Sequence, residues 1–184
     1  VKDGIMPGYF GYEAGQSCVG DHFAWFVENC VPESYEQEAR VRGISIHQLL
    51  SEKLSTYKAG ASGLLALDWF NGVRTPLMDF NLNGLIMGMN LLTKPEEIYL
   101  SLIEATAYGT RMIIEGFEEA GLEVKDITLS GGIPIKNEML VQVYSDVCNR
   151  KIKVVDSTQS SALGAAILGA AAAPERITGF KNAN

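Results

Sequence analysis

The second half of the chain restricts the fold most, because strand-like and helix-like segments alternate along it. A short apolar segment, 127–130, is predicted to form a buried strand that ends at the pair Gly131-Gly132. A helical pattern follows over 136–148, and a second strand is predicted over 152–155 before a small-residue helix over 160–172. This alternation favours an α/β layer architecture in which the two strands lie side by side and parallel.

The first half is predicted to contribute shorter elements. The aromatic and glycine-rich segment 7–15 has the composition of a strand that leads into a tight turn. A helix is predicted over 20–29, and short apolar strands over 64–67 and 85–89. No internal repeat divides these elements, so we expect them to share one core.

A long helix is predicted over 94–120. Thr93 and Glu96 have the three-residue spacing of a capping box, and Gly121 stands where a helix C-terminus favours glycine. This helix is long enough to organise the packing of a whole domain.

The segment 33–60 has a different character, because it is polar and rich in charge. Within it, apolar residues recur at nearly helical spacing over 45–57, which predicts an amphipathic helix. We interpret 33–60 as a helical insertion or lid element.

Length, charge and cysteine usage narrow the function classes. A chain of 184 residues suits one domain. With 15 basic and 22 acidic residues, the net charge of −7 argues against a nucleic-acid partner. Three cysteines without a CxxC pair favour neither a disulfide scaffold nor a zinc site, so no metal ligands are assigned and a reducing cytoplasm is the simplest location.

Two features of the chain's extent add expectations. The longest run of apolar and small residues, 162–173, is shorter than the roughly 20 residues that cross a bilayer, so no membrane partner is expected. The chain opens at Val1 and not at methionine, which favours a fragment of a longer protein.

The glycine pair offers the best candidate for a ligand site. A turn at Gly131 and Gly132 lets a ligand approach without a Cβ in its way, and the helix after it presents free N–H groups to a phosphate. A tight structural turn is the more common explanation of such a pair taken alone. The small residues of 161–166 and the carboxylate of Glu13, within a small-residue segment, strengthen the ligand interpretation.

Four strings of residues resemble a known family. They occur in the order and spacing of the C-terminal domain of the FGGY carbohydrate kinases, and are PGYFGYEAGQSCVGDHFAWF (7–26), LDWFNGVRTP (67–76), LSGGIPIKN (129–137) and QSSALGAAIL (159–168). The EAGQS and LDWFNGVRTP words resemble the branch of this family that phosphorylates L-ribulose. No GxSxG, HExxH or Walker A sequence points elsewhere.

The resemblance implies an α/β, actin-like (ribonuclease-H-like) ATPase fold that is incomplete at its N-terminus, with 1–184 as the C-terminal domain. It implies ATP and Mg²⁺ as cofactors and transfer of the γ-phosphoryl group to the 5-hydroxyl of L-ribulose. The family's catalytic aspartate and its N-terminal sugar-binding domain would precede Val1. Because phosphoryl transfer needs both walls of the cleft, we expect this piece alone to turn over no sugar.

The resemblance also assigns roles to particular residues. Positions matching the family's nucleotide contacts are Gly20, Gly131, Gly132, Lys136 and Asn137. Glu13 is the candidate for a sugar-hydroxyl contact, because a carboxylate accepts two such hydrogen bonds. Ala24 stands where the glycerol kinases carry glutamine.

Other interpretations remain open at this point. The chain could belong to another FGGY kinase that acts on xylulose or a different pentulose, since few hydroxyl contacts separate these substrates. It could also be a non-catalytic, actin-like nucleotide-binding module, for which a sugar-facing Glu13 would have no use. A homo-oligomer is compatible with each of these.

Overall fold

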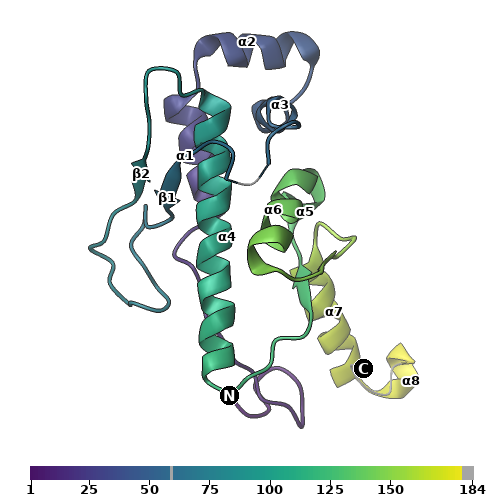
Figure 1. The fold of residues 1–184 in the computed structure, drawn as a ribbon. Coiled ribbons are helices and arrows are strands. Elements are labelled where there is room, and N and C mark those ends of the chain that lie inside the picture. Colours follow the sequence, from purple (N-terminus) through teal and green to yellow (C-terminus); the bar gives the residue numbers. More distant parts are fainter. Residues whose placement is uncertain (59, 180–184) are drawn as a thin grey trace.

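The computed structural model describes residues 1–58 and 60–179, and other helices pack against one long helix, α4 (Pro95–Glu119) (Figure 1). Pro95 occupies the first turn, where its missing N–H costs nothing. The predicted cap is shifted by one residue. The Lys94 N–H donates to Glu97 Oε2 at 2.7 Å, whereas Glu96 is buried and accepts a hydrogen bond from the Tyr35 hydroxyl at 2.8 Å.

Three helices cover the N-terminal half of α4. They are α1 (Gly20–Cys30), α2 (Glu33–Arg42) and α3 (Ile46–Lys53), and Figure 1 shows α2 lying across the end of the molecule while α1 runs beside α4. The helix predicted over 45–57 is α3, which is shorter than expected because it ends at Lys53. Ser45 is its N-cap, and Ser45 Oγ accepts the Gln48 N–H. The segment 33–60 holds α2 and α3, and its interpretation as an insertion stays a prediction.

Two short strands, β1 (Leu65–Leu67) and β2 (Leu85–Met87), form an antiparallel pair beside α4, on its left in Figure 1. Ala66 pairs with Ile86 on the face toward the core, and Leu65 pairs with Met87 on the outer face, where each is about half exposed (51% and 54%). The segment 7–15 forms no strand, so that prediction was wrong. Within the described residues no strand lies beside it, and only an isolated bridge joins Lys2 to Phe10.

The C-terminal half contains the predicted parallel pair, β3 (Ile127–Leu129) and β4 (Ile152–Val154). Between them lie α5 (Gly132–Lys136) and α6 (Glu138–Cys148), so the helix predicted over 136–148 begins two residues later than expected and a short helix that was not predicted precedes it. Asn137 separates the two helices, and its Oδ1 caps α6 by accepting the Leu140 N–H at 3.0 Å.

The strand β3 is half-exposed and not buried, which corrects the prediction for 127–130. It has a strand neighbour on one edge only, β4, among the described residues. The helix α7 (Ser160–Ala172), followed by α8 (Glu175–Thr178), likewise buries none of its described side chains, and Figure 1 places it away from α4. The packed core therefore ends at α6.

The hydrophobic core is one cluster centred on α4, with aromatic and aliphatic side chains from α1, α3, β1 and α6 packed against it. Its largest fully buried members include Tyr99, Phe26, Leu50, Leu102 and Ile103. No described helix combines the length and apolar character needed to traverse a bilayer.

Candidate functional site

The glycine turn after β3 has a backbone that only glycine adopts easily. Gly131 has φ 101° and ψ −177°, a region essentially closed to residues with a Cβ. Gly132 begins α5, and a Cβ added at either glycine would meet no atom within 4 Å. The turn therefore faces open space in which a ligand could sit.

A cavity of about 490 Å³ lies beside this turn, and we call it the α1/α3 cavity. Its volume is within the range of roughly 300–1,000 Å³ typical of small-molecule sites. Three elements enclose it together with Tyr99 of α4: the first turns of α1, the polar face of α3 and the region of α5. Its lining residues include Gly20, Ala24, Ser45, His47, Gln48, Ser51, Gly132, Lys136 and Asn137.

The structure brings together most of the residues predicted to contact a nucleotide. Gly20, Gly132, Lys136 and Asn137 all line the α1/α3 cavity, while Gly131 lines an adjoining cavity of about 330 Å³ that also includes Gly132. A Cβ at Gly20 would lie 3.0 Å from Ile133 Cδ1, so glycine there allows α1 and α5 to approach closely. Their roles as nucleotide contacts remain predictions.

Sequence reasoning missed the contribution of α3 to this cavity. His47 is half-buried and its Nδ1 lies 3.0 Å from the Tyr99 hydroxyl. Burial lowers the pKa of His47 and raises the pKa of Tyr99, so both side chains are neutral near pH 7. The signal was present in the sequence, since His47, Gln48 and Ser51 form one polar face opposite Leu49 and Leu50 of the same helix.

Glu13 lies outside this cavity, in a second cluster. Its Oε1 accepts a hydrogen bond from Arg74 Nη2 at 2.6 Å, and its side chain is 80% exposed. Two hydrogen bonds hold the backbone of this cluster: Thr75 N–H donates to Gly15 O at 3.1 Å, and Gly15 N–H donates to Thr75 Oγ1 at 3.2 Å. The EAGQS and LDWFNGVRTP segments, separated widely in sequence, thus form one site.

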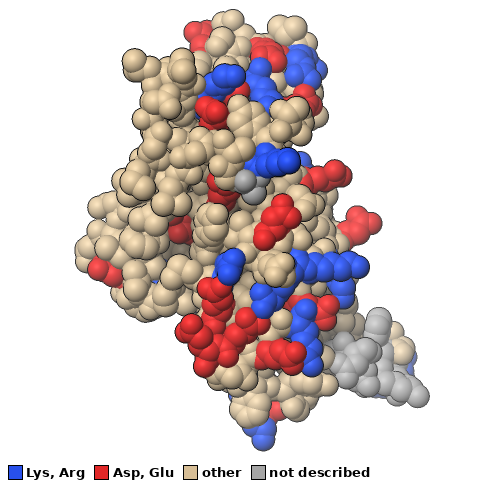
Figure 2. All heavy atoms as spheres, viewed as in Figure 1, with Lys and Arg blue, Asp and Glu red and all other residues tan. Residues whose placement is uncertain are grey.

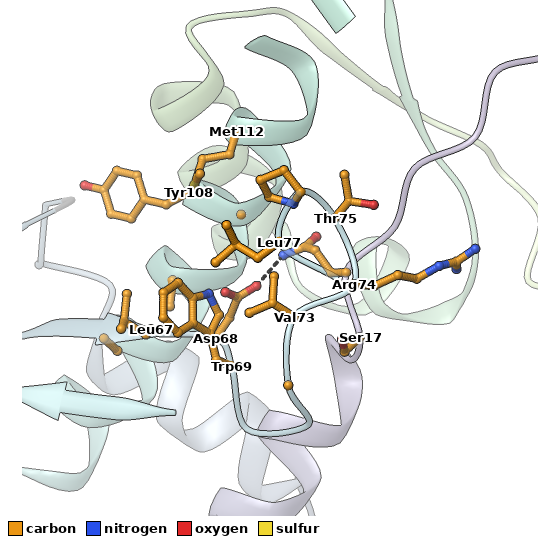
Figure 3. A pocket seen from close by; sticks show the side chains of 16 residues that line it. Ser17, Leu67, Asp68, Trp69, Val73, Arg74, Thr75, Leu77, Tyr108 and Met112 are labelled. Atoms are coloured by element: carbon orange, nitrogen blue, oxygen red, sulfur yellow. Dashed lines mark hydrogen bonds between the residues drawn. The ribbon is translucent and has the colours of Figure 1, made fainter. Parts of the chain in front are cut away.

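The interior of this second cluster is a polar network against α4 (Figure 3). The Gln16 amide donates to Asp68 Oδ2 at 2.7 Å and to Thr106 O at 2.9 Å, and accepts from Thr110 Oγ1 at 2.9 Å. A small cavity of about 80 Å³ lies beside it, lined by Trp69, Tyr108 and others. In Figure 3 the Arg74 side chain points away from Trp69 and Tyr108. Its Nη2 donates to Glu13 Oε1.

Histidine 22 holds the start of α1 to the same loop. Its ring is buried, with Nε2 lying 2.9 Å from Asp68 O and Nδ1 lying 3.2 Å from Val19 O. Cys18 is also buried beside it, and burial raises the pKa of this thiol, which keeps it protonated. The cluster is therefore structural support for the loop and not a nucleophilic pair.

The charged surface is mixed in sign. Figure 2 shows Lys, Arg, Asp and Glu side chains interspersed on the face that it views. Exposed ion pairs such as Arg111–Glu115 and Lys153–Asp126 account for part of this pattern. Within residues 1–58 and 60–179, no group of three or more His, Cys, Asp or Glu side chains is arranged to hold a metal ion.

Comparison with known proteins places this chain in a family. Residues 1–173 match the FGGY family of carbohydrate kinases, C-terminal domain. The chain is 56% identical over 180 residues to the ribulokinase of Bacillus licheniformis, covering 98% of this chain and 33% of that protein. It is 53% identical over 182 residues to the ribulokinase of Anoxybacillus flavithermus, covering 99% of this chain and 32% of that protein. The chain thus spans about a third of the length of these relatives.

Solved structures show the same fold at lower identity. The xylulose kinase of Rhodospirillum rubrum superimposes with a TM-score of 0.63 at 22% identity, covering 76% of this chain and 26% of that one. The glycerol kinase of Plasmodium falciparum, solved with ADP, gives a TM-score of 0.62 at 23% identity, covering 83% of this chain and 28% of that one. The expected α/β, actin-like ATPase fold is confirmed, and the chain belongs to the FGGY family of carbohydrate kinases through its C-terminal domain.

Proposed function

We propose that this chain supplies the nucleotide-binding wall of an ATP-dependent kinase that phosphorylates L-ribulose. The observation that carries the proposal is the α1/α3 cavity, because it is bordered by Gly20, Gly132, Lys136 and Asn137 together. These are the positions that the family resemblance assigns to the nucleotide. Small residues at the turn leave space for a flat purine, and Lys136 provides a cation at its border.

Magnesium would arrive with the nucleotide. Mg²⁺ in phosphoryl-transfer sites is typically held by one or two carboxylates together with substrate phosphates. Residues 1–58 and 60–179 contain no group of three acidic, His or Cys side chains arranged to hold a metal ion. Bound Mg²⁺ would neutralise charge on the transferred phosphoryl group.

The sugar end of the site is assigned to the second cluster. The Glu13 carboxylate is exposed, and Arg74 accounts for one of its oxygens, so the remaining lone pairs are available to sugar hydroxyls. The hydrogen bonds between Gly15 and Thr75 fix this carboxylate relative to the loop. Such a contact has no purpose in a module that binds only nucleotide.

The remaining parts of the reaction lie beyond these residues. We propose that the base that accepts the hydroxyl proton, and the other wall of the cleft, come from a part of the protein outside this chain. The setting that the family suggests is cytoplasmic sugar breakdown, in the catabolism of L-arabinose. Light scattering on the full-length protein tests whether the enzyme is a homo-oligomer.

The test uses the full-length protein with Glu13→Gln and, as a matched control, Glu123→Gln, whose carboxylate pairs with exposed Lys125 on the loop after α4. We expect Glu13→Gln to raise KM for L-ribulose about tenfold or more and to leave the affinity for ATP unchanged, as titration calorimetry with ATP and Mg²⁺ would measure. An unchanged KM would contradict the sugar role. A panel of L-ribulose, D-ribulose and D-xylulose then identifies the preferred pentulose.

A further inference from the structure

The α1/α3 cavity contains a chain of hydrogen bonds whose direction is fixed from one end. The Leu140 backbone N–H can only donate, so the Asn137 oxygen faces it at 3.0 Å. Burial raises the pKa of Tyr99 and hydrogen bonding with the Asn137 side chain lowers it in part, and the group left for that interaction is the Asn137 amide NH₂, which can only donate. The Tyr99 oxygen is therefore an acceptor from Asn137.

The Tyr99 hydroxyl has a single proton to donate, and one acceptor remains for it. His47 Nδ1 lies 3.0 Å from this oxygen, so the hydroxyl donates to Nδ1. A neutral imidazole that accepts at Nδ1 carries its proton at Nε2. The backbone cap of α6 thus determines, through two side chains, which nitrogen of His47 is a donor.

The Nε2–H group has no hydrogen-bond partner among residues 1–58 and 60–179. His47 lines the same cavity as Gly132, Lys136 and Gln48. A half-buried N–H donor held in one tautomer at a cavity wall suits a ligand that presents an acceptor nitrogen in the plane of an aromatic ring. Purines present such nitrogens.

We propose that His47 is a specificity-determining residue that donates from Nε2 to a ring nitrogen of the purine, with Asn137 and Tyr99 acting as positioning residues that hold it in the donor tautomer. This inference rests on the proposed function, because it names how the nucleotide of that site is recognised. It also gives α3 a role: the polar face of this helix closes the base end of the cavity.

The experiment measures binding to the full-length protein by calorimetry. The ligands are Mg²⁺ complexes of ATP, 1-deaza-ATP, 3-deaza-ATP, 7-deaza-ATP and inorganic tripolyphosphate, which has no base. The variants are His47→Ala, His47→Gln and Tyr99→Phe, and the matched control is Gln37→Ala on α2, where the Gln37 amide contacts only Glu33 at the surface.

We expect one deaza analogue to bind the unsubstituted protein about threefold to tenfold more weakly than ATP, the usual effect of one lost hydrogen bond. In His47→Ala this difference in affinity disappears, because the variant binds ATP itself more weakly by the same factor. His47→Gln restores part of the difference, since an amide NH₂ can donate from a similar place. Tyr99→Phe reduces it, because the histidine is then free to change tautomer. Gln37→Ala leaves every value unchanged.

Two results would overturn the inference. One is a deaza difference that persists unchanged in His47→Ala. The other is a loss of affinity in His47→Ala that is equal for ATP and tripolyphosphate, which indicates a structural role. Failure of the proposed function looks different: the unsubstituted protein would then bind ATP no better than tripolyphosphate.

Discussion

Gln16 and Asp68 stand 52 positions apart in sequence, yet Gln16 Nε2 lies 2.7 Å from Asp68 Oδ2. The same amide contacts Thr106 and Thr110, one turn apart on α4. One side chain therefore joins the segment that precedes α1, the loop after β1 and the central helix. Because all these groups are partly or fully buried, each lost partner would leave a polar atom without compensation.

Gly109 on α4 makes this junction possible, and we predict that Gly109→Ala breaks it. A Cβ at Gly109 would lie 2.5 Å from Gln16 Nε2 and 2.6 Å from Asp68 Oδ2, closer than side-chain atoms can approach. We expect a loss of about 1–3 kcal/mol in the free energy of unfolding. Urea unfolding of the full-length protein, followed by circular dichroism, measures it.

Gly116→Ala is the matched control, on the same helix with nothing within 4 Å of the added Cβ. Alanine favours a helix interior over glycine by about 0.8–1.0 kcal/mol, so this variant should be neutral or more stable. If both substitutions had the same effect, the close approach at Gly109 would not be the cause.

The glycine pair predicts a separation of stability from ligand binding. Gly131→Ala forces a Cβ onto a backbone with φ 101°, at a cost of about 1–3 kcal/mol in folding. Gly132→Ala adds a methyl group at a helical position with no neighbour within 4 Å, so the folded state should tolerate it. That methyl group projects at the cavity border, and we expect weaker ATP binding.

Thermal unfolding and ATP titration on the two variants provide the measurement. The expected pattern is a lowered melting temperature for Gly131→Ala and an unchanged one, with reduced affinity, for Gly132→Ala. Full ATP affinity in Gly132→Ala would show that the nucleotide does not approach this turn.

Glu104 is a buried carboxylate that should cost stability at neutral pH. It is 4% exposed, and its Oε1 accepts the Gly60 N–H at 2.5 Å, with no cationic side chain paired to it in the described residues. Burial raises the pKa of Glu104 above the ordinary 4.5. A raised pKa in the folded state means that stability is complete below pH 4.5 and falls as pH rises through the folded-state pKa.

We therefore expect Glu104→Gln to raise the melting temperature at pH 7 by a few degrees, because the amide can still accept from Gly60 and carries no charge. The gain should shrink as pH is lowered toward 4.5. Glu115→Gln, which removes an exposed carboxylate paired with Arg111, should change the melting temperature little at either pH.

His47 predicts a pH dependence of the opposite sign. Burial lowers its pKa below the ordinary 6.5, and the Tyr99 hydroxyl donates to its Nδ1, which a protonated ring could not accept. The stability linked to neutral His47 is thus complete above pH 6.5 and is lost as pH falls through the folded-state pKa. Unfolding free energies measured from pH 7.5 to 5 should fall less steeply in His47→Gln than in the unsubstituted protein.

The sequence allowed correct prediction of the elements whose causes are local. The parallel strands β3 and β4, the long helix α4 and the glycine turn between strand and helix all follow from periodicity and turn chemistry. The candidate nucleotide residues share cavities because they flank these same elements. The predicted cap at Glu96 was wrong because the Tyr35 hydroxyl donates to the buried Glu96 carboxylate, and Glu97 caps the helix in its place.

Features set by distant partners could not be predicted in this way. No local signal says that Gln16 reaches Asp68, or that His47 of a polar segment lies against Tyr99. The strand predicted over 7–15 failed for the same reason, because a strand exists only where a neighbour completes its hydrogen bonds. The segment 7–15 has a strand-like composition, but among the described residues no neighbouring strand pairs with it.

The central helix fixes the geometry between the two ends of the site. Tyr99 and Gly109 are ten residues apart on α4, which is about 15 Å along the helix axis. One inserted residue between them would rotate one end about 100° relative to the other and move the α1/α3 cavity away from its present position relative to the Gln16–Asp68 junction. The number of residues between Tyr99 and Gly109 therefore sets both the spacing and the rotation of the two ends. Substitutions along this stretch should be tolerated more readily than insertions or deletions.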